Sequence, residues 1–394
     1  MSAWLRGVWR CPNRRLMGAK ALASIIFFAP DLAETAQVRR IRSFVRLGHS
    51  VSSVSMHKGR DRQGATWPDL SLGQIADEQL GRRLLLALKG LRKLWQHRTR
   101  IRQSDLIIAR NIDMVMLALA ARFICGRRVP VVYECLDIHG IFTGVGRKGA
   151  VARWTERIAL SRVALLVVSS PGFIEHYFGP TQKYGGPWVL LQNKLWFAGD
   201  PLSRPATPPL RYGPLVLGWV GAIRCQPSLD LLCAVAALMP DSLRIVIRGV
   251  IHDHALPGFQ GRIAAHPNMY YDGPYTYPDG LAQVYGACDL VWAQDLWQRG
   301  ANSDWLLPNR IYEASWFGCP SIAVAGTQTA AKIGDDGLGY VIDTASADAL
   351  CNLLQSLTRD GIVRVQQGIL RRPDSDFALG SAEIAAVVTM GTQP

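Results

Sequence analysis

The chain has 394 residues, of which 49% are hydrophobic and 19% are charged, and it carries a formal net charge of +14. This length suits two domains with separate cores, and the ordinary globular composition excludes a wholly disordered chain. No apolar run reaches the ~18 residues that cross a bilayer, and the basic stretch before Ala21 is not followed by a good signal-peptide cleavage site.

The positive charge is confined to the first third of the chain. Residues 1–130 hold 24 Lys and Arg against 8 Asp and Glu, whereas residues 131–394 hold 20 against 22. This asymmetry predicts an anionic partner for the first third alone: a membrane surface, a nucleic acid or a polyphosphate. A basic surface without a partner is the plainer alternative. The scattered cysteines, with no C-x-x-C pair, are typical of buried cytosolic thiols.

After a basic extension, residues 1–23, the chain opens with a βαβ pattern. The apolar run from Ser24 to Ala29 predicts a buried parallel strand, and a helix follows with Val38 and Phe44 on its apolar face. Gly48 ends this helix, and a second strand comes next.

A strongly basic segment, residues 78–102, follows. Leucines recur at spacings of three and four, and most other positions are Arg or Lys. The pattern predicts a basic amphipathic helix, which suits an anionic membrane interface. The apolar stripe could equally face the domain core, with the basic face merely solvated. We favour membrane contact.

A β-rich run, Val129 to Ile138, ends in polar side chains before a glycine loop. Asp137 and His139 stand at near-alternating positions just ahead of Gly140. Side chains at the carboxyl end of a parallel strand commonly face a ligand. The alternative is that Asp137 caps a helix and His139 lies on a loop surface.

Proline-rich residues 197–214 form the best linker in the chain. We therefore predict an N-terminal domain over 24–196, a second α/β domain over 215–374 and a crossover tail over 375–394. The second domain opens with a strand in which Gly221 lets the backbone approach a ligand closely. Arg224 follows as a fixed positive charge suited to a diphosphate, and Arg248 closes the next strand.

The stretch around Pro308 predicts a strand, a loop, a helix and another strand. The helix begins near Asn309 and Arg310, beside the carboxyl end of a parallel sheet, and Gly318 ends it. Unpaired N–H groups at such a helix start favour phosphate. Glu313 falls one turn into the helix, where its carboxylate could accept hydrogen bonds from a sugar diol.

These motifs resemble the retaining, family 4-type glycosyltransferases. Pro308 to Glu313, followed by Gly318-Cys319-Pro320, is similar to the family's P-N-K-[LIF]-[YF]-E and G-[KC]-P motifs. The run Y-E-C-L-D-I from Tyr133 is similar to its Y-E-x-x-D-[LI] strand end. The resemblance implies a GT-B fold: two Rossmann-like domains facing across a cleft, with a C-terminal helix crossing back to the N-terminal domain.

The resemblance also implies roles for site residues. Glu313 would bind the donor's ribose hydroxyls, and Asp137 and His139 would touch the donor sugar or the acceptor hydroxyl. The predicted donor-binding residues are Gly221, Arg224, Arg248, Asn309, Arg310 and Glu313, and the predicted catalytic residues are Asp137, His139, Arg224 and Glu313.

The chain departs from the family pattern in two places. The turn after the first strand, Asp31 to Thr35, lacks the Gly-rich sequence of many relatives. The position eight before Glu313 is Trp305 rather than a second glutamate, with Asp304 adjacent but out of register. Acceptor contacts and contacts to the sugar ring are therefore less well defined by the sequence.

The resemblance implies a metal-independent hexosyltransferase with a nucleoside diphosphate sugar donor, most simply UDP-linked. The basic first third suggests a polyprenyl-diphosphate-linked glycan acceptor, as in bacterial exopolysaccharide synthesis, and a cytoplasmic enzyme peripheral on the inner membrane face. The patterns His252-Asp253-His254 and Asp374-Ser375-Asp376 lack the spacing or setting of a metal site. Two alternatives are a nucleotide-sugar epimerase of the same fold and a non-catalytic nucleic-acid-binding protein; the second leaves Pro308 to Glu313 unexplained.

Overall fold

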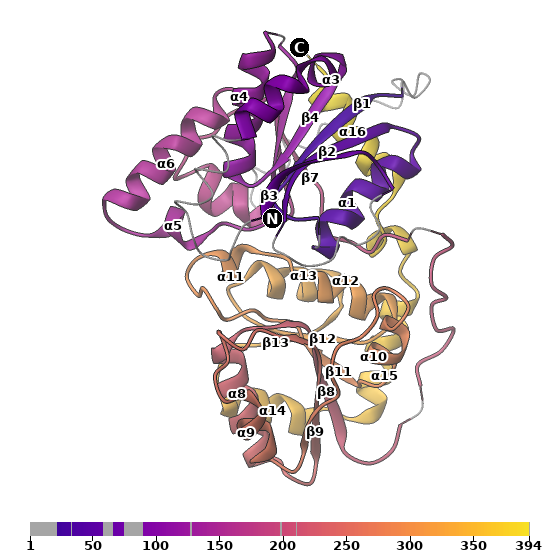
Figure 1. Cartoon of the computed structure of the whole chain (residues 1–394). Coiled ribbons are helices and arrows are strands. Elements are labelled where there is room, and N and C mark those ends of the chain that lie inside the picture. Colours follow the sequence, from indigo (N-terminus) through magenta and orange to yellow (C-terminus); the bar gives the residue numbers. More distant parts are fainter. Residues whose placement is uncertain are drawn as a thin grey trace.

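The structure, a computed structural model, forms two parallel-sheet domains stacked one above the other (Figure 1). It describes residues 22–57 except Ala33, and residues 66–74, 90–126, 128–197, 199–209 and 211–393. In these ranges no helix combines the length and apolar character required to cross a bilayer.

The N-terminal domain is built on a seven-stranded parallel sheet in the order β3-β2-β1-β4-β5-β6-β7. Because parallel strands need crossover connections, helices cover both faces of the sheet. The strands are β1 (Ser24–Ala29), β2 (Ser50–His57), β3 (Asp69–Gln74), β4 (Leu106–Arg110), β5 (Val131–Cys135), β6 (Leu165–Val168) and β7 (Trp188–Leu190). The helices are α1 (Thr35–Arg46), α3 (Arg98–Gln103), α4 (Ile112–Cys125), α5 (Gly140–Thr143), α6 (Arg147–Leu160) and α7 (Pro171–Phe173), which runs into a π-helical turn, η2 (Ile174–Phe178).

Strand β1 shows why this sheet needs cover on both sides. Its side chains alternate between faces, so Ile26 and Phe28 join the core beneath α4 and α6. Ile25 and Phe27 point the other way, into a core shared with α1 and the C-terminal helix. All four are at most 3% exposed, which makes β1 a central strand.

The C-terminal domain repeats this plan on a six-stranded parallel sheet in the order β10-β9-β8-β11-β12-β13. The strands are β8 (Leu215–Ile223), β9 (Leu243–Ile251), β10 (Met269–Tyr271), β11 (Leu290–Trp292), β12 (Ser321–Val324) and β13 (Gly339–Ile342). The helices are α8 (Gln226–Leu238), α9 (Phe259–Ala264), α10 (Leu281–Gly286), α11 (Asn302–Trp305), α12 (Asn309–Trp316), α13 (Gln328–Asp336), α14 (Ala347–Ser356) and α15 (Arg359–Leu370), followed by a short 3₁₀ turn, η3 (Asp374–Asp376).

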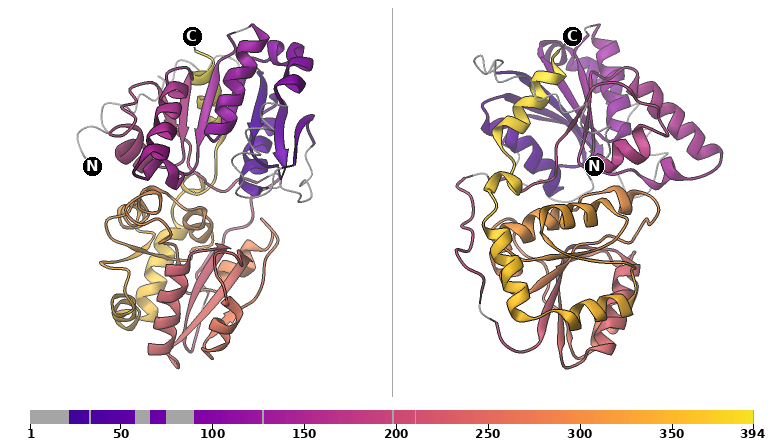
Figure 2. Two further views of the ribbon diagram at one scale, coloured as in Figure 1. Left: turned by 60° about the vertical axis from the view of Figure 1, so that its left-hand side comes forward. Right: turned by 180° about the vertical axis from the view of Figure 1, so that it is seen from behind.

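The last helix, α16 (Ser381–Gly391), lies on the N-terminal domain rather than on its own. Ile384, Val387 and Val388 pack into the same core as Phe27. Figure 2 shows this helix in yellow running along the upper domain. The predicted GT-B architecture, with its helix crossing back, is confirmed.

Residues 78–89 of the basic segment 78–102 lie outside the described residues. From Gly90 onward it is helical, but it is not the single helix that we predicted, because a turn at His97 separates residues 90–96 from α3. Leu94 and Ile101 are packed in the domain core, whereas Trp95 is half exposed. In its described part, then, the apolar stripe serves mainly the core, and membrane contact by this segment stays a prediction.

Candidate active site at the domain boundary

Glu313 is a buried acid on α12, the helix that the sequence placed beside the sheet edge. Pro308 precedes the helix, and Glu313 is 6% exposed. Tyr285 donates a hydrogen bond of 2.9 Å from its hydroxyl to Glu313 Oε2. Burial raises the pKa of Glu313, and Arg39, the Tyr285 bond and Arg310 act against that rise. The net result is a buried carboxyl group with a raised pKa, and the two arginines and the Tyr285 hydroxyl limit that rise.

Arg310 lies at the first turn of α12 against the end of β8, and Asn309, half-buried, opens the same helix. A Cβ atom built on Gly221 would stand 3.8 Å from the Arg310 guanidinium. Gly221 has φ of +115° and pairs with Gly249 of β9, whose own Cβ would come within 1.8 Å of the Gly221 carbonyl oxygen. Only glycine fits at Gly249, and at Gly221 bare backbone lies beside the Arg310 guanidinium, an arrangement that suits a phosphate.

Arg248, just before Gly249, belongs to the same group. Its Nε is buried and has no hydrogen-bond partner within the described part of the chain. Burial raises the pKa of Tyr275, Glu313 raises it further, and Arg310 and Arg248 act to lower it. Both arginines therefore lie close enough to this tyrosine to influence it. The structure thus gathers Gly221, Arg310, Glu313 and Arg248 around one place.

Asp137 follows β5 and meets the C-terminal domain through Asn302 of α11. Asn302 donates from Nδ2 to Asp137 Oδ1 at 3.2 Å and accepts the backbone N–H of Ile138 at 2.8 Å. Asp137 is exposed as a residue, but surrounding protein desolvates its carboxylate and raises its pKa. Asn302 and Arg224 oppose this rise. Arg224, three residues after Gly221 in the chain, therefore lies close enough to Asp137 to influence its pKa.

His139 is exposed two residues beyond Asp137. Its Nδ1 accepts the N–H of Ile141 at 3.2 Å, so the histidine caps the short helix α5. The loop-surface alternative for His139 and its predicted contact with a substrate are both compatible with this position. Asp137 is not a helix cap, because its carboxylate bonds Asn302 instead.

Arg39 is a site residue that the sequence did not single out. It lies on α1 of the N-terminal domain, is 8% exposed, and donates to the Tyr277 hydroxyl of the other domain at 2.7 Å. Its guanidinium stands 5.6 Å from the Tyr277 ring centre, and it is the foremost influence lowering the pKa of Glu313. Arg39 looked like one of several basic helix residues, and no local pattern distinguishes it from its neighbours.

Trp305, in the register where many relatives place a glutamate, has a different use. Its carbonyl oxygen accepts a bond from Ser170, and its ring stacks on His176 at 6.0 Å. Asp304 pairs with Arg299 at 3.2 Å and accepts the Gly300 N–H. In this chain the position joins the domains rather than offering a carboxylate.

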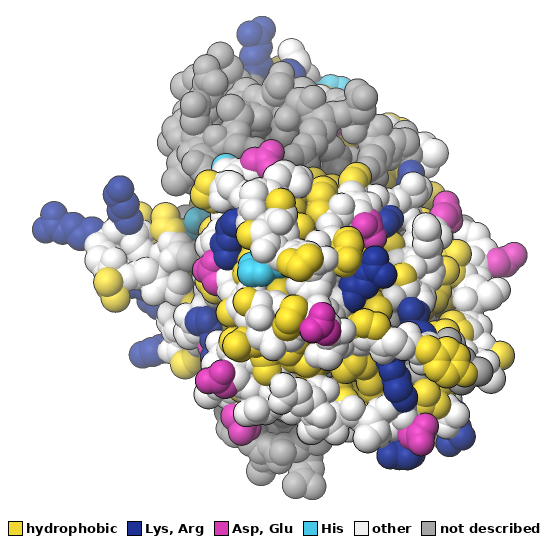
Figure 3. Space-filling view, turned by 90° about the horizontal axis from the view of Figure 1, so that it is seen from below, with side chains coloured by type: hydrophobic (Ala, Val, Ile, Leu, Met, Phe, Trp, Pro, Cys, Tyr) yellow, Lys and Arg dark blue, Asp and Glu magenta, His cyan; other side chains and the backbone are white. Residues whose placement is uncertain are grey.

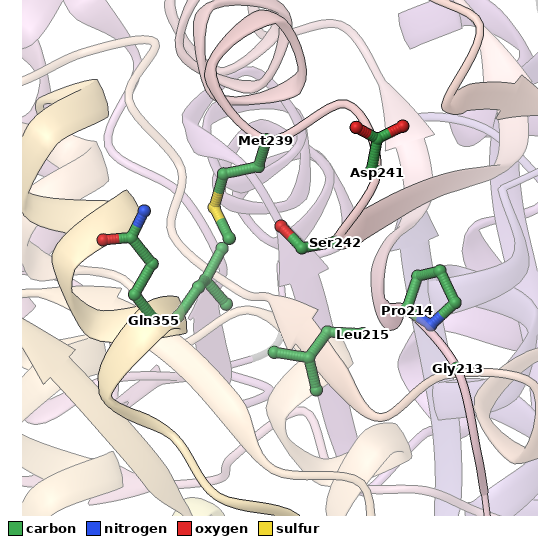
Figure 4. A pocket seen from close by; sticks show the side chains of 8 residues that line it. Gly213, Pro214, Leu215, Met239, Asp241, Ser242 and Gln355 are labelled. Atoms are coloured by element: carbon green, nitrogen blue, oxygen red, sulfur yellow. The ribbon is translucent and has the colours of Figure 1, made fainter.

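A hollow elsewhere in the C-terminal domain does not fit a donor (Figure 4). It is lined by residues at the starts of β8 and β9, including Leu215 and Ser242. Gly221 lies near the other end of β8. Asp241 is the only charged side chain among its lining residues. Without a cation, this hollow offers nothing to a diphosphate.

Known proteins are similar to this chain in sequence and in fold. The family model described as "Glycosyl transferase 4-like domain" matches residues 33–179. The succinoglycan biosynthesis protein ExoL of Rhizobium meliloti (strain 1021) is 33% identical over 373 residues, which cover 93% of each chain.

Two solved structures show the same fold at low identity. Anabaena Alr3699/HepE in complex with UDP and glucose aligns with a TM-score of 0.65 at 14% identity, covering 94% of this chain and 100% of that one. Sucrose-phosphate synthase from Thermosynechococcus elongatus aligns with a TM-score of 0.72 at 14% identity, covering 92% and 96%. With a relative one-third identical along nearly its whole length, the chain belongs to the 4-like family of glycosyl transferases and is a glycosyltransferase of GT-B fold.

Proposed function

We propose that this enzyme transfers a hexose from a UDP-sugar to a polyprenyl-diphosphate-linked glycan during exopolysaccharide synthesis, with retention of configuration. The observation that carries the proposal is the gathering of Gly221, Arg310 and Arg248 beside the buried acid Glu313. The Anabaena structure is a complex with UDP and glucose, and the Rhizobium relative is a succinoglycan biosynthesis protein. These two proteins support the donor and the pathway class proposed here.

The chemistry of the leaving group explains the choice of residues. When the glycosyl–phosphate bond breaks, negative charge develops on the departing nucleoside diphosphate. Arg224, Arg248, Arg310 and the start of α12 would supply fixed positive charge there, which is the role we assign to them in place of a metal ion. We infer that Glu313 holds the ribose hydroxyls and so fixes where the diphosphate lies.

The acceptor would approach from the N-terminal domain. Asp137 and His139 stand on that side of the domain boundary, with Arg224 close to Asp137. We infer that they orient the donor sugar and the acceptor hydroxyl, and that the leaving phosphate itself assists removal of the acceptor proton. Membership of a glycosyltransferase family argues against the epimerase and the nucleic-acid binder.

A substitution at Glu313 tests the proposal. The purified full-length chain is incubated with labelled UDP-, ADP-, GDP- and TDP-hexoses and lipid-linked acceptors, and the products are separated. We expect transfer from a UDP-hexose, and Glu313→Gln should reduce it on the order of 100-fold, because hydrogen bonds to charged groups are worth about 1.5–3 kcal/mol each.

The matched control is Asp348→Asn, an exposed acid at the start of α14. It should retain full activity. A fully active Glu313→Gln variant would refute the site assignment, and an epimerised free UDP-sugar without transfer would refute the reaction.

A further inference from the structure

One part of the N-terminal domain exposes three large apolar side chains within ten residues of the chain. We call residues 140–160, which comprise α5, α6 and the turn between them, the α5–α6 lobe. Val145 is 101% exposed, and Val151 and Trp154, three residues apart on α6, are each 61% exposed. Residues at i and i+3 share a helix face, so Val151 and Trp154 form one apolar strip. The lobe projects at the left of Figure 3, with hydrophobic and basic side chains on its surface.

The turn that carries Val145 is held firmly in place. Arg153 donates from Nη1 to the carbonyl oxygens of Phe142 at 3.0 Å and Gly144 at 2.8 Å. A Cβ atom on Gly149 would lie 2.3 Å from the Gly144 oxygen, so the turn lies directly against the start of α6. Because these contacts fix the turn, the fold itself keeps the Val145 side chain exposed to solvent. Exposed apolar clusters of this kind mark interaction sites.

The charge of the lobe defines its partner. Between His139 and Ile174 the only acidic residue is Glu156, which is buried, whereas Arg147, Lys148 and Arg157 are exposed. The surface of the lobe therefore combines apolar side chains with cations and presents no carboxylate. An anionic bilayer matches both features, since it attracts Lys and Arg and accepts Val and Trp at its interface.

The lobe starts at the candidate active site. Helix α5 begins directly after His139, and a Cβ atom on Gly140 would stand 3.5 Å from the Gln298 side chain of the other domain. Val145 follows Gly140 by five residues, which span at most about 18 Å. A lipid-linked substrate leaving a bilayer at Val145 would thus be near Asp137 and His139.

We propose that the α5–α6 lobe docks the enzyme on an anionic bilayer by inserting Val145, Val151 and Trp154, and so presents the lipid-linked acceptor to the active site. The argument for docking uses the lobe alone. The role given to docking, presentation of the acceptor, depends on the function proposed above. The described part of residues 78–102 turns Leu94 and Ile101 into the core, so the docking proposed here uses the lobe rather than these two side chains.

Vesicle co-sedimentation of the full-length chain tests the docking. The vesicles contain phosphatidylcholine alone or phosphatidylcholine mixed with phosphatidylglycerol. We expect binding to the anionic vesicles, and Val145→Ser with Val151→Ser and Trp154→Ser should weaken it by about tenfold or more. Arg147→Gln with Lys148→Gln should weaken it and reduce its salt dependence. Val145→Trp, which enlarges the inserted group, should strengthen it.

The matched control replaces exposed apolar residues of the C-terminal side: Tyr212→Ser, Leu238→Ser and Val250→Ser. It should bind vesicles as the wild type does. Equal loss in the control, or unchanged binding by the lobe variant and by Val145→Trp, would overturn the proposal.

Calorimetric titration with UDP reports on the donor site separately. UDP binding should be the same in every variant, which shows that the C-terminal domain of each is folded, and far-ultraviolet circular dichroism checks the fold of the whole chain. If wild-type protein binds vesicles through the lobe but transfers no hexose to a lipid-linked acceptor, the proposed function fails while the docking stands.

Discussion

At the scale of single residues, we expect the ionisation of Glu313 to set how the proposed donor site responds to pH. Burial raises the pKa of this carboxyl above its ordinary value of 4.5. The ionised form is the better acceptor for two ribose hydroxyls, so donor affinity should be full above the raised pKa and fall as the pH drops through it. We expect the UDP dissociation constant, measured by calorimetry, to begin rising on acidification while the pH is still above 4.5.

Three variants separate the causes of this pH dependence. Arg39→Met removes the foremost influence that lowers the pKa of Glu313, so the loss of affinity should move to higher pH. Tyr277→Phe removes the hydrogen bond to Arg39 but leaves the charge of Arg39 in place. The dependence of UDP affinity on pH should therefore be nearly unchanged. In the Glu313→Gln variant, UDP affinity should not fall in this way on acidification. An identical acid profile in wild type and Glu313→Gln would contradict this account.

The candidate site residues that could be predicted from the sequence are those that belong to short local motifs. Glu313, Arg310 and Gly221 stand in short motifs at a strand end or a helix start, and the structure brings them together. Arg39 and Asn302 could not be predicted in this way. Their partners lie 238 and 164 residues away along the chain, and only the packing of two domains makes them neighbours.

At the scale of elements, the docking of α16 depends on Gly391. A Cβ atom there would stand 2.8 Å from Val132 Cγ2 of β5 and 3.1 Å from Leu106 of β4. Gly391→Ala should therefore push the helix away from the sheet and destabilise the protein by about 1–3 kcal/mol, the usual cost of overpacking a core. Chemical denaturation measures this change.

Gly368 of α15 is the matched control, because it too is a helical glycine but a Cβ atom there meets nothing within 4 Å. Gly368→Ala should stabilise the protein by up to about 1 kcal/mol, since alanine is the better helix former. If both alanines raise stability alike, α16 does not rest on β4 and β5 through Gly391.

Elements with a strong apolar pattern were predictable, and those that depend on their neighbours were not. Strand β1 and helix α16 are apolar enough to be recognised from sequence alone. Strand β3 was missed, because D-L-S-L-G-Q offers few apolar side chains and, among the strands that the structure describes, pairs only with β2. The break at His97 was missed for a related reason: the leucine spacing continues through it, while tertiary packing decides where the helix is interrupted.

At the scale of the whole molecule, the contacts between the two domains include several specific pairs of residues. Asn302 bonds the backbone after β5, Arg39 bonds Tyr277, and Trp305 stacks on His176. The first two of these pairs include or adjoin a residue of the candidate site. Part of the candidate site therefore depends on how the two domains pack, which a family motif in a single domain cannot convey.

Asn302→Ala tests whether domain contact completes the site. The change leaves the Ile138 N–H buried without its acceptor and frees the carboxylate of Asp137. Donor groups on the C-terminal domain are untouched, so UDP affinity should stay nearly constant while hexose transfer falls by about tenfold, the effect of losing roughly 1.4 kcal/mol.

The control is Gln328→Ala, which removes an exposed interdomain bond of 3.1 Å to Glu175 away from Asp137. Since exposed contacts contribute little, it should transfer hexose at the wild-type rate. Equal losses in the two variants would mean that Asn302 only holds the domains together, and a fully active Asn302→Ala would remove Asp137 from the reaction.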